Sequence, residues 1–384
     1  MTTISLIPRV RVNYSFKDLW YALWISERYD TYRSILKKQL EEIYHTSNIL
    51  LTSSGRSSLY MILKSLPQQK VHIPAYTCIA VVEAILLASK EIVYVKTESE
   101  TFNANEYKDL DANSIVVATH QYGIPCDIKS ISEACQKSGA VLIEDCAGAM
   151  GTEIEGQQVG TFGDYGFFSF DSSKLINVPS KGGFIISRSS ETLQAIIKAT
   201  NLKSSDLHFK VKHLCRGLVY SLLKSGISYK CFHYLTMGRK HNVQLENHST
   251  PSLELSDFYQ YTFSEWQASI AVKQVQRIKD IITKRKSIYE YYDRNLHNNL
   301  ILKPIACNSA SCIRYSVRVE NRDNFYWYLI RNGIDGGFSF RNIAAPNEYV
   351  DEHHIANTVL NIPFYASLKK KEIEKVDKII NEYE

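Results

Sequence analysis

The chain has 384 residues, of which 45% are hydrophobic and 22% charged, with a formal net charge of +5. These values are ordinary for a folded globular protein and exclude a largely disordered chain. The length is enough for about two domains. The mild positive charge favours small anionic ligands slightly, and because no long basic tract is present we expect no nucleic-acid partner.

The sequence leads us to expect neither a signal peptide nor a membrane-spanning helix. The first 16 residues lack the apolar core of a signal peptide, and no apolar run is long enough to span a membrane. The eight cysteines are scattered without a C-x-x-C pair, which indicates free thiols and argues against a disulfide framework or a zinc site. We therefore expect a cytoplasmic protein with no metal site and no membrane association.

Helical and strand patterns alternate over most of the first 200 residues. Residues 16–46 have helical spacing, as in "SILKKQLEEIYH". From there, short apolar runs alternate with helical segments in "NILLTSSGRSSLYMILKSL", "KVHIPAYTCIAVVEAILLASKEIVYV" and "SIVVATHQYGIPCDIKSISEACQKSGAVLIEDCAGAMG". This order predicts an α/β domain with a mostly parallel central sheet and helices on both faces. We assign it residues 30–250, after an N-terminal segment of residues 1–29.

Residues 203–250 interrupt this alternation with an apolar, basic and helix-like stretch. It could be a lid, an oligomer contact or a membrane-surface patch, but an inserted helical pair packed on the parent domain is the favoured interpretation. Residues 251–384 then predict a smaller α+β domain. It begins with one long helix from "FSEWQASIAV", followed by a strand near "CIRYSVRV", a helix near "NFYWYLIRNG" and a last helix, "KKEIEKVDKIINEY".

A turn rich in serine and glycine provides the first candidate for a binding site. In open α/β sheets, ligands bind beyond the carboxyl ends of the strands. Gly55, Arg56 and Ser57 lie between a predicted strand and a predicted helix. Free backbone N–H groups and the helix dipole make such a turn an anion site, although similar turns also cap helices without binding anything.

Two further loops place a carboxylate and an amine at the same edge of the sheet. Asp145 ends an apolar strand, where a carboxylate needs a cation or a ring N–H, unless it is simply a helix cap. Lys174 follows the aromatic strand "GFFSF", and a lysine confined in an apolar pocket can act as a Schiff-base nucleophile; Lys181 is the alternative lysine. An anion cradle, a carboxylate and an amine in this order fit pyridoxal 5′-phosphate (PLP).

Several motifs resemble one enzyme family. "GTFGDYGFFSFDSSK" is similar to the G-x-x-G-D-x-x-x-F-S-F-x-x-x-K signature of the DegT/DnrJ/StrS family of PLP-dependent nucleotide-sugar aminotransferases. "SSGRSSLYMIL", "IPAYTCIAVVEAILLA", "HQYGIPCDIKSI", "IEDCAGAMG" and "LNIPFYASLKKKEI" resemble further family segments, so that the similarity covers most of the chain. Residues 203–250 alone lack a clear counterpart.

The resemblance implies a fold, a cofactor and substrates. It implies the aspartate aminotransferase-like fold (type I) and a homodimer with active sites at the subunit interface. It also implies that Lys174 binds PLP covalently, that Asp145 pairs with the pyridinium nitrogen, and that the phosphate is held by Ser169, Gly55, Arg56 and Ser57. The substrates would be an amino-acid donor, usually glutamate, and a keto-sugar nucleotide used for amino sugars of surface polysaccharide or a secondary metabolite. Sugar dehydratases of the family carry histidine in place of the lysine.

Other positions depart from the family pattern. Cys78 stands where an aromatic residue often stacks on the cofactor ring, with Tyr76 as a possible replacement, and Gly148 stands where glutamine or histidine is common. Gln260 takes the place of an asparagine that usually reaches the partner's phosphate, and Ser339 and Phe340 replace a frequent His-Tyr pair. These departures leave two alternatives open: a PLP enzyme with another keto or lipid-linked acceptor, and a PLP-binding regulatory homologue without turnover.

Overall fold

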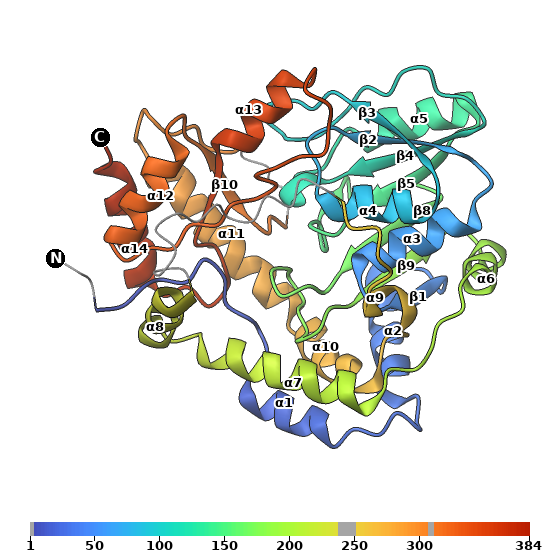
Figure 1. Cartoon of the computed structure of the whole chain (residues 1–384), viewed down its shortest axis with the longest axis horizontal. Helices are drawn as coiled ribbons and strands as arrows, with labels where there is room; N and C mark the ends of the chain where they lie inside the picture. The colour runs from blue at the N-terminus through green and yellow to red at the C-terminus, as the bar shows by residue number, and fades with distance from the viewer. Residues whose placement is uncertain (1–3, 237–250, 306–310) are drawn as a thin grey trace.

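A seven-stranded sheet forms the centre of the computed structural model, which describes residues 4–236, 251–305 and 311–384 (Figure 1). In spatial order its strands are β1 (Ile49–Thr52), β9 (Gly183–Ser187), β8 (Tyr165–Ser169), β5 (Val141–Asp145), β4 (Ser114–Thr119), β2 (Lys70–Pro74) and β3 (Glu91–Val95). β9 runs antiparallel to both of its neighbours, and the remaining pairs are parallel. The predicted mostly parallel α/β sheet is therefore confirmed.

Helices cover both faces of this sheet, because its central strands are apolar on both sides. They are α2 (Thr31–Tyr44), α3 (Gly55–Ser65), α4 (Ile79–Leu87), α5 (Ile128–Ser138) and α6 (Ser190–Ala199). One core cluster joins the sheet to α3, α4 and α6, and another joins it to α2 and to α10 (Glu265–Val275). The short elements η1 (Gln121–Gly123), β6 (Glu153–Ile154), β7 (Gln157–Gln158) and α9 (Asp257–Gln260) lie in the connections.

The N-terminal segment and the inserted segment pack together. α1 (Phe16–Leu23) lies beside α7 (Leu207–Leu222) along the lower edge of the molecule in Figure 1, and α8 (Gly226–Thr236) follows α7. Gly217 permits this contact, because a Cβ atom there would lie 3.0 Å from Leu19 Cδ2 and 2.7 Å from Pro179 Cβ. The rest of the predicted insertion, residues 237–250, lies outside the described residues.

A second core lies in the C-terminal part of the chain. It is built from α11 (Ile278–Asn295), β10 (Tyr315–Arg318), α12 (Arg322–Arg331), β11 (Val359–Ile362) and α14 (Lys370–Asn381), with α13 (Val350–Thr358) beside it. The long helix expected here is two helices, α10 and α11, separated at Gln276 and Arg277. The boundary expected at residue 251 lies before α10, whose Trp266 is fully buried in the core of the large domain. No helix among the described residues is long and apolar enough to cross a membrane.

Candidate active site

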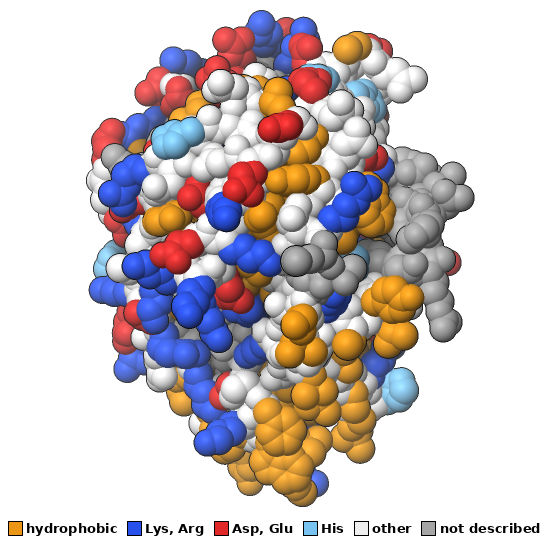
Figure 2. Space-filling view, turned by 90° about the vertical axis from the view of Figure 1, so that its left-hand side faces the viewer, with side chains coloured by type: hydrophobic (Ala, Val, Ile, Leu, Met, Phe, Trp, Pro, Cys, Tyr) orange, Lys and Arg blue, Asp and Glu red, His pale blue; other side chains and the backbone are white. Residues whose placement is uncertain are grey.

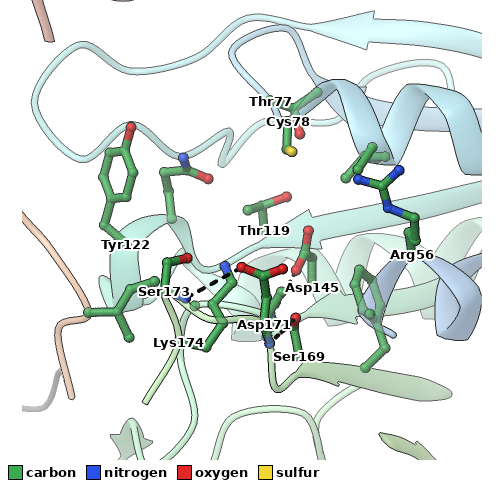
Figure 3. A pocket seen from close by; sticks show the side chains of 18 of the residues that line it. Arg56, Thr77, Cys78, Thr119, Tyr122, Asp145, Ser169, Asp171, Ser173 and Lys174 are labelled. Atoms are coloured by element: carbon green, nitrogen blue, oxygen red, sulfur yellow. Dashed lines mark hydrogen bonds between the residues drawn. The ribbon is translucent and has the colours of Figure 1, made fainter. Parts of the chain in front are cut away.

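One pocket lies at the carboxyl ends of the parallel strands, with a cavity of about 310 Å³. Thr119 ends β4 and Asp145 ends β5, and the two residues are direct neighbours in the register of the sheet. Ser169 ends β8, and Figure 3 shows the side chains of Thr119, Asp145, Ser169 and Lys174 gathered around the same space. This is the position where open α/β sheets bind ligands.

A tight turn after β8 presents Lys174 to the pocket. The backbone N–H of Asp171 donates to Ser169 Oγ (3.3 Å), and Asp171 Oδ1 accepts from the N–H of Ser173 (3.4 Å). The N–H of Lys174 then donates to the Asp171 carbonyl (2.9 Å). Asn177 Nδ2 donates to the Lys174 carbonyl at 3.1 Å. The turn is therefore fixed by hydrogen bonds on both sides of the lysine.

Burial shifts the pKa values of Lys174 and Asp145 in opposite directions. Burial lowers the pKa of Lys174, and the nearby Arg314 guanidinium lowers it further, while Asp145 and Asp171 oppose this effect. Burial raises the pKa of Asp145, against a hydrogen bond from the Ala147 N–H (2.9 Å) and the charge of Lys174. The pocket therefore favours a neutral amine at Lys174 and supplies a carboxylate that a cationic partner would stabilise.

The N-terminus of α3 forms a cradle beside Ser169. Ser54 caps the helix by accepting from the Ser57 N–H (3.1 Å), whereas the first N–H groups of a helix have no intrahelical partner. A Cβ atom on Gly55 would lie 3.0 Å from Ser169 Cβ, and one on Gly183 would lie 2.3 Å from the Phe168 carbonyl oxygen. Only glycine at these positions allows helix and strands to approach so closely.

Arg56 lines the pocket but has a partner in its own chain. Its Nη1 is 2.9 Å from Glu83 Oε2 on α4, and Glu83 also accepts a hydrogen bond from the Ser252 N–H (3.1 Å). Lys181 lines the same pocket, with its amine 4.7 Å from the centre of the Phe258 ring. Arg56 and Lys181 therefore both border the cradle, and the charge of Arg56 is already compensated by Glu83.

The pocket brings together most of the predicted site residues. It is lined by the predicted Gly55, Arg56, Cys78, Asp145, Gly148, Ser169 and Lys174. Packing favours glycine at position 148, because a Cβ atom there would lie 3.1 Å from Ile313 Cδ1.

Three predicted residues lie outside the pocket lining. Ser57 is buried inside α3, with its hydroxyl directed at Met61 Sδ (3.7 Å). Tyr76 is fully buried behind the pocket, where its hydroxyl meets that of Tyr122 (2.7 Å). Gln260 is exposed, and its Nε2 donates to the Leu255 carbonyl (3.0 Å).

Thr119 and Arg314 also line the pocket and were not among the predicted site residues. Thr119 Oγ1 is buried and has no hydrogen-bond partner in the described structure. Arg314 lies before β10, and within the described ranges no carboxylate forms an ion pair with its guanidinium. The position of Thr119 at a strand end was a usable signal, whereas nothing in "CIRYSVRV" pointed to Arg314.

Glu144, the neighbour of Asp145, has a structural role. Its carboxylate accepts from the N–H groups of Gly160 (2.8 Å), Phe162 (2.7 Å) and Gly163 (2.8 Å) and meets His120 Nε2 at 3.1 Å. His120, Glu144 and Cys146 could by their spacing hold a metal ion. The hydrogen bonds already use both carboxylate oxygens, so this cluster anchors the loop before β8.

The donor set of the pocket fits PLP. The α3 N-terminus and Ser169 Oγ suit a phosphate, Asp145 suits a protonated ring nitrogen, and Lys174 suits an aldehyde. The unpartnered hydroxyl of Thr119 is a polar group that needs a ligand atom in this cavity. These residues lie at the ends of separate strands and at the start of one helix, and they all line the same pocket.

Comparisons with known proteins identify the family of this chain. The model of the DegT/DnrJ/EryC1/StrS aminotransferase family matches residues 16–381. The chain is similar to the UDP-N-acetyl-3-dehydro-alpha-D-glucosamine 3-aminotransferase of Acidithiobacillus ferrooxidans, at 24% identity covering 85% of this chain and 82% of that protein. It is also similar to the GDP-perosamine synthase of Escherichia coli O157:H7, at 24% identity covering 94% of this chain and 92% of that protein.

A solved structure shares the fold. The protein Spr1654 of Streptococcus pneumoniae, in its PMP form, has a TM-score of 0.75 to this chain at 16% identity. The match covers 98% of each chain, so that the whole architecture is common to both proteins.

Proposed function

Because the chain belongs to the DegT/DnrJ/EryC1/StrS aminotransferase family, we propose that it uses PLP to transfer an amino group from L-glutamate to a keto-sugar nucleotide. The observation that carries this proposal is the meeting of half-buried Lys174 and buried Asp145 in one pocket beside the α3 N-terminus. The PMP form of the similar Streptococcus pneumoniae protein supports the choice of cofactor.

Residues at three strand ends would hold the cofactor. The N–H groups of Gly55 and Arg56 and the hydroxyl of Ser169 bind the phosphate, and the α3 dipole adds to this attraction. Asp145 would accept a hydrogen bond from the ring nitrogen and so favour its protonated form. PLP, when bound, supplies an aldehyde that takes up the donor's amine and a ring that withdraws electrons from the donor's α-carbon.

Lys174 moves the proton in both halves of the reaction. With PLP bound, Lys174 Nζ would accept the proton lost from the donor's α-carbon, and in the second half it would deliver a proton to the sugar carbon that gains the amino group. A base at this position must be neutral, and burial together with Arg314 lowers the pKa of Lys174 in that direction. The turn through Asp171 holds Nζ over the cavity during these steps.

Arg314 is the group that we assign to the donor's carboxylate. Its guanidinium faces the pocket without an ion-pair partner among the described residues, and a carboxylate is the ligand that arginine binds best in this geometry. Apolar side chains of Leu59, Val81, Phe167 and Ile313 border the same cavity and exclude water from it.

The acceptor class is inferred from the relatives, and the assembly is inferred from the position of Gln260. The two similar proteins named above carry UDP- and GDP-linked sugars in their names, so a keto-sugar nucleotide is the acceptor class we infer here. Gln260 lies away from the pocket of its own chain, so its inferred role at the phosphate requires a homodimer in which each subunit completes the other's site.

The test is transfer of labelled nitrogen. The enzyme with PLP and ¹⁵N-L-glutamate is incubated with UDP-, GDP- and dTDP-linked 3-keto and 4-keto sugars, and the sugar products are analysed by mass spectrometry. We expect ¹⁵N in one amino-sugar nucleotide, and none with Lys174→Ala. If 2-oxoglutarate forms but no sugar gains nitrogen, the acceptor is wrong. If neither product forms, the enzymatic proposal is wrong.

A further inference from the structure

The outward face of α1 is apolar although it faces solvent. Leu19 and Ala22 on the inner face are buried, at 5% and 0% exposure. On the opposite face Phe16, Trp20 and Trp24, four residues apart, are 56%, 57% and 71% exposed. Their rings form a continuous stripe, with centroids 6.5 Å and 6.0 Å apart. A surface helix normally carries polar residues there, so the fold of this chain does not explain the stripe.

α7 extends this apolar surface. Its inner side packs through Phe209 and Leu214, while Leu207 and Leu222 are 72% and 62% exposed. Lys210 Nζ donates to the Ile25 carbonyl (2.7 Å) and fastens α7 to the end of α1. We call the exposed apolar residues of the two helices the α1–α7 face: Phe16, Trp20, Tyr21, Leu23, Trp24, Leu207, Val211, Leu218, Val219 and Leu222. Figure 2 shows hydrophobic side chains gathered at the lower end of the molecule, where Figure 1 places these helices.

Basic residues outnumber acidic ones along α7 and α8. Between Asp206 and Thr236 the sequence contains no aspartate or glutamate, and its basic residues are Lys210, Lys212, Arg216, Lys224 and Lys230. Lys212 and Arg216 are exposed on α7, and Lys17 is exposed on α1. The nearby acids bond within the chain: Asp18 with Lys273 (2.8 Å), Glu27 with the Glu265 N–H (2.9 Å) and Asp206 with the Phe209 N–H (2.7 Å).

We propose that the α1–α7 face docks on the surface of an anionic lipid bilayer, with both helices lying in the interfacial plane. Tryptophan and tyrosine are the side chains that favour the headgroup region, and lysine and arginine beside them attract anionic lipids. No described helix is able to span the bilayer, so the contact is peripheral. The proposal is independent of the proposed function, and it replaces the sequence-based expectation of no membrane association.

A second copy of the chain fits this face less well. A two-fold contact through α7 would bring Lys212 and Arg216 close to the same residues of the other copy. The bordering acids Asp18, Glu27 and Asp206 are engaged within their own chain and are poorly placed to compensate this repulsion. A bilayer surface with anionic headgroups supplies the opposite charge directly.

Vesicle flotation of the full chain tests the proposal. We expect the wild type to float with vesicles of phosphatidylcholine and phosphatidylglycerol, less so at high salt, and to stay at the bottom with phosphatidylcholine alone. Lys212→Ser with Arg216→Ser should weaken binding on the order of 30-fold, and Trp20→Ser with Trp24→Ser should abolish it. Matched controls outside the face, Lys370→Ser with Lys371→Ser, and Trp327→Ser, should bind like the wild type.

A second readout uses the wild type alone, in case a variant fails to fold. Brominated phosphatidylcholine in the anionic vesicles should quench tryptophan fluorescence, because Trp20 and Trp24 are exposed whereas Trp266 is fully buried. The proposal is overturned if the wild type neither floats nor is quenched, or if the variants in the α1–α7 face bind as tightly as the controls. It is also overturned if those variants lower the oligomeric mass in light scattering while no vesicle binding occurs, since a second copy then covers the face.

Discussion

Replacing Arg314 by methionine should weaken substrate binding and strengthen the fold. Arg314 lines the pocket half-buried, and among the described residues no carboxylate forms an ion pair with its guanidinium. A charge-assisted hydrogen bond contributes about 1.5–3 kcal/mol. The KM for L-glutamate in Arg314→Met should therefore rise by about 10- to 150-fold. A half-buried charge without an ion-pair partner has lost part of its hydration, so the same variant should gain about 1 kcal/mol in free energy of unfolding.

The same substitution should move the pH dependence of the reaction. Arg314 lowers the pKa of Lys174, so its removal raises that pKa. Since the amine must be neutral to accept a proton, the rise of kcat with pH should shift to higher pH.

The assays are donor half-reaction kinetics against pH, followed by absorbance, and urea unfolding. Arg318→Met is the matched control on β10, because Arg318 donates hydrogen bonds to Thr358 and the Ser99 carbonyl and does not line the pocket. The control should lose a little stability and keep the KM. An unchanged KM in Arg314→Met would refute the assignment to the donor's carboxylate, and a loss of stability would refute the account of its unpaired charge.

Three further substitutions test the rest of the site and its support. Asp145→Asn should lower kcat on the order of 100-fold while PLP still binds, because the ring nitrogen loses its carboxylate; steady-state kinetics and PLP titration decide this, and loss of PLP binding would contradict it. Burial lowers the pKa of His213 to about 4, below its unfolded value of 6.5, so stability should fall as the pH drops from 6.5 towards 4, by about 2–3 kcal/mol. In urea unfolding at pH 6.5 and at pH 4, His213→Phe should remove this loss of stability. The prediction is wrong if the wild type and the variant lose the same free energy of unfolding between the two pH values. Gly183→Ala should cost about 2–3 kcal/mol of stability in the same melts, because its Cβ would lie 2.3 Å from the Phe168 carbonyl oxygen; a neutral result would show that the strands can move apart.

Local sequence patterns were enough to predict the strand ends of this site. Lys174, Asp145 and Gly55 each follow or end a recognisable apolar run, and parallel strands bring such positions to one edge. The helical and strand periodicities that predicted the sheet are visible within short segments of sequence. Whether such a segment forms a helix or a strand depends little on the rest of the chain. The predicted α/β architecture was accordingly confirmed.

Contacts between distant segments could not be predicted in this way. Arg314 reaches the pocket from the C-terminal part of the chain, and its neighbour Ile313 would be in tight contact with a side chain at Gly148, whose Cβ would lie 3.1 Å from Ile313 Cδ1. Tyr76 was expected near the cofactor ring, but its hydroxyl bonds to Tyr122 in a buried aromatic group. Which of several apolar faces becomes buried is decided by packing across the whole fold.

The same reasoning applies to α1. Its sequence is apolar on two sides, so spacing alone gives no preference between Leu19 and Trp20 as the buried residue. The packing of α7 and α10 on one side decides it and leaves Trp20 and Trp24 exposed. This exposure, which is a property of the folded chain, is what suggests a surface for lipid.

The most direct test of the central claim is to identify the lysine that carries the cofactor. The protein is saturated with PLP, reduced with borohydride and digested, and the modified peptide is identified by mass spectrometry. We predict the added mass on Lys174, and its loss when L-glutamate is added before reduction. Modification of Lys181, or of neither lysine, would contradict the account of this pocket.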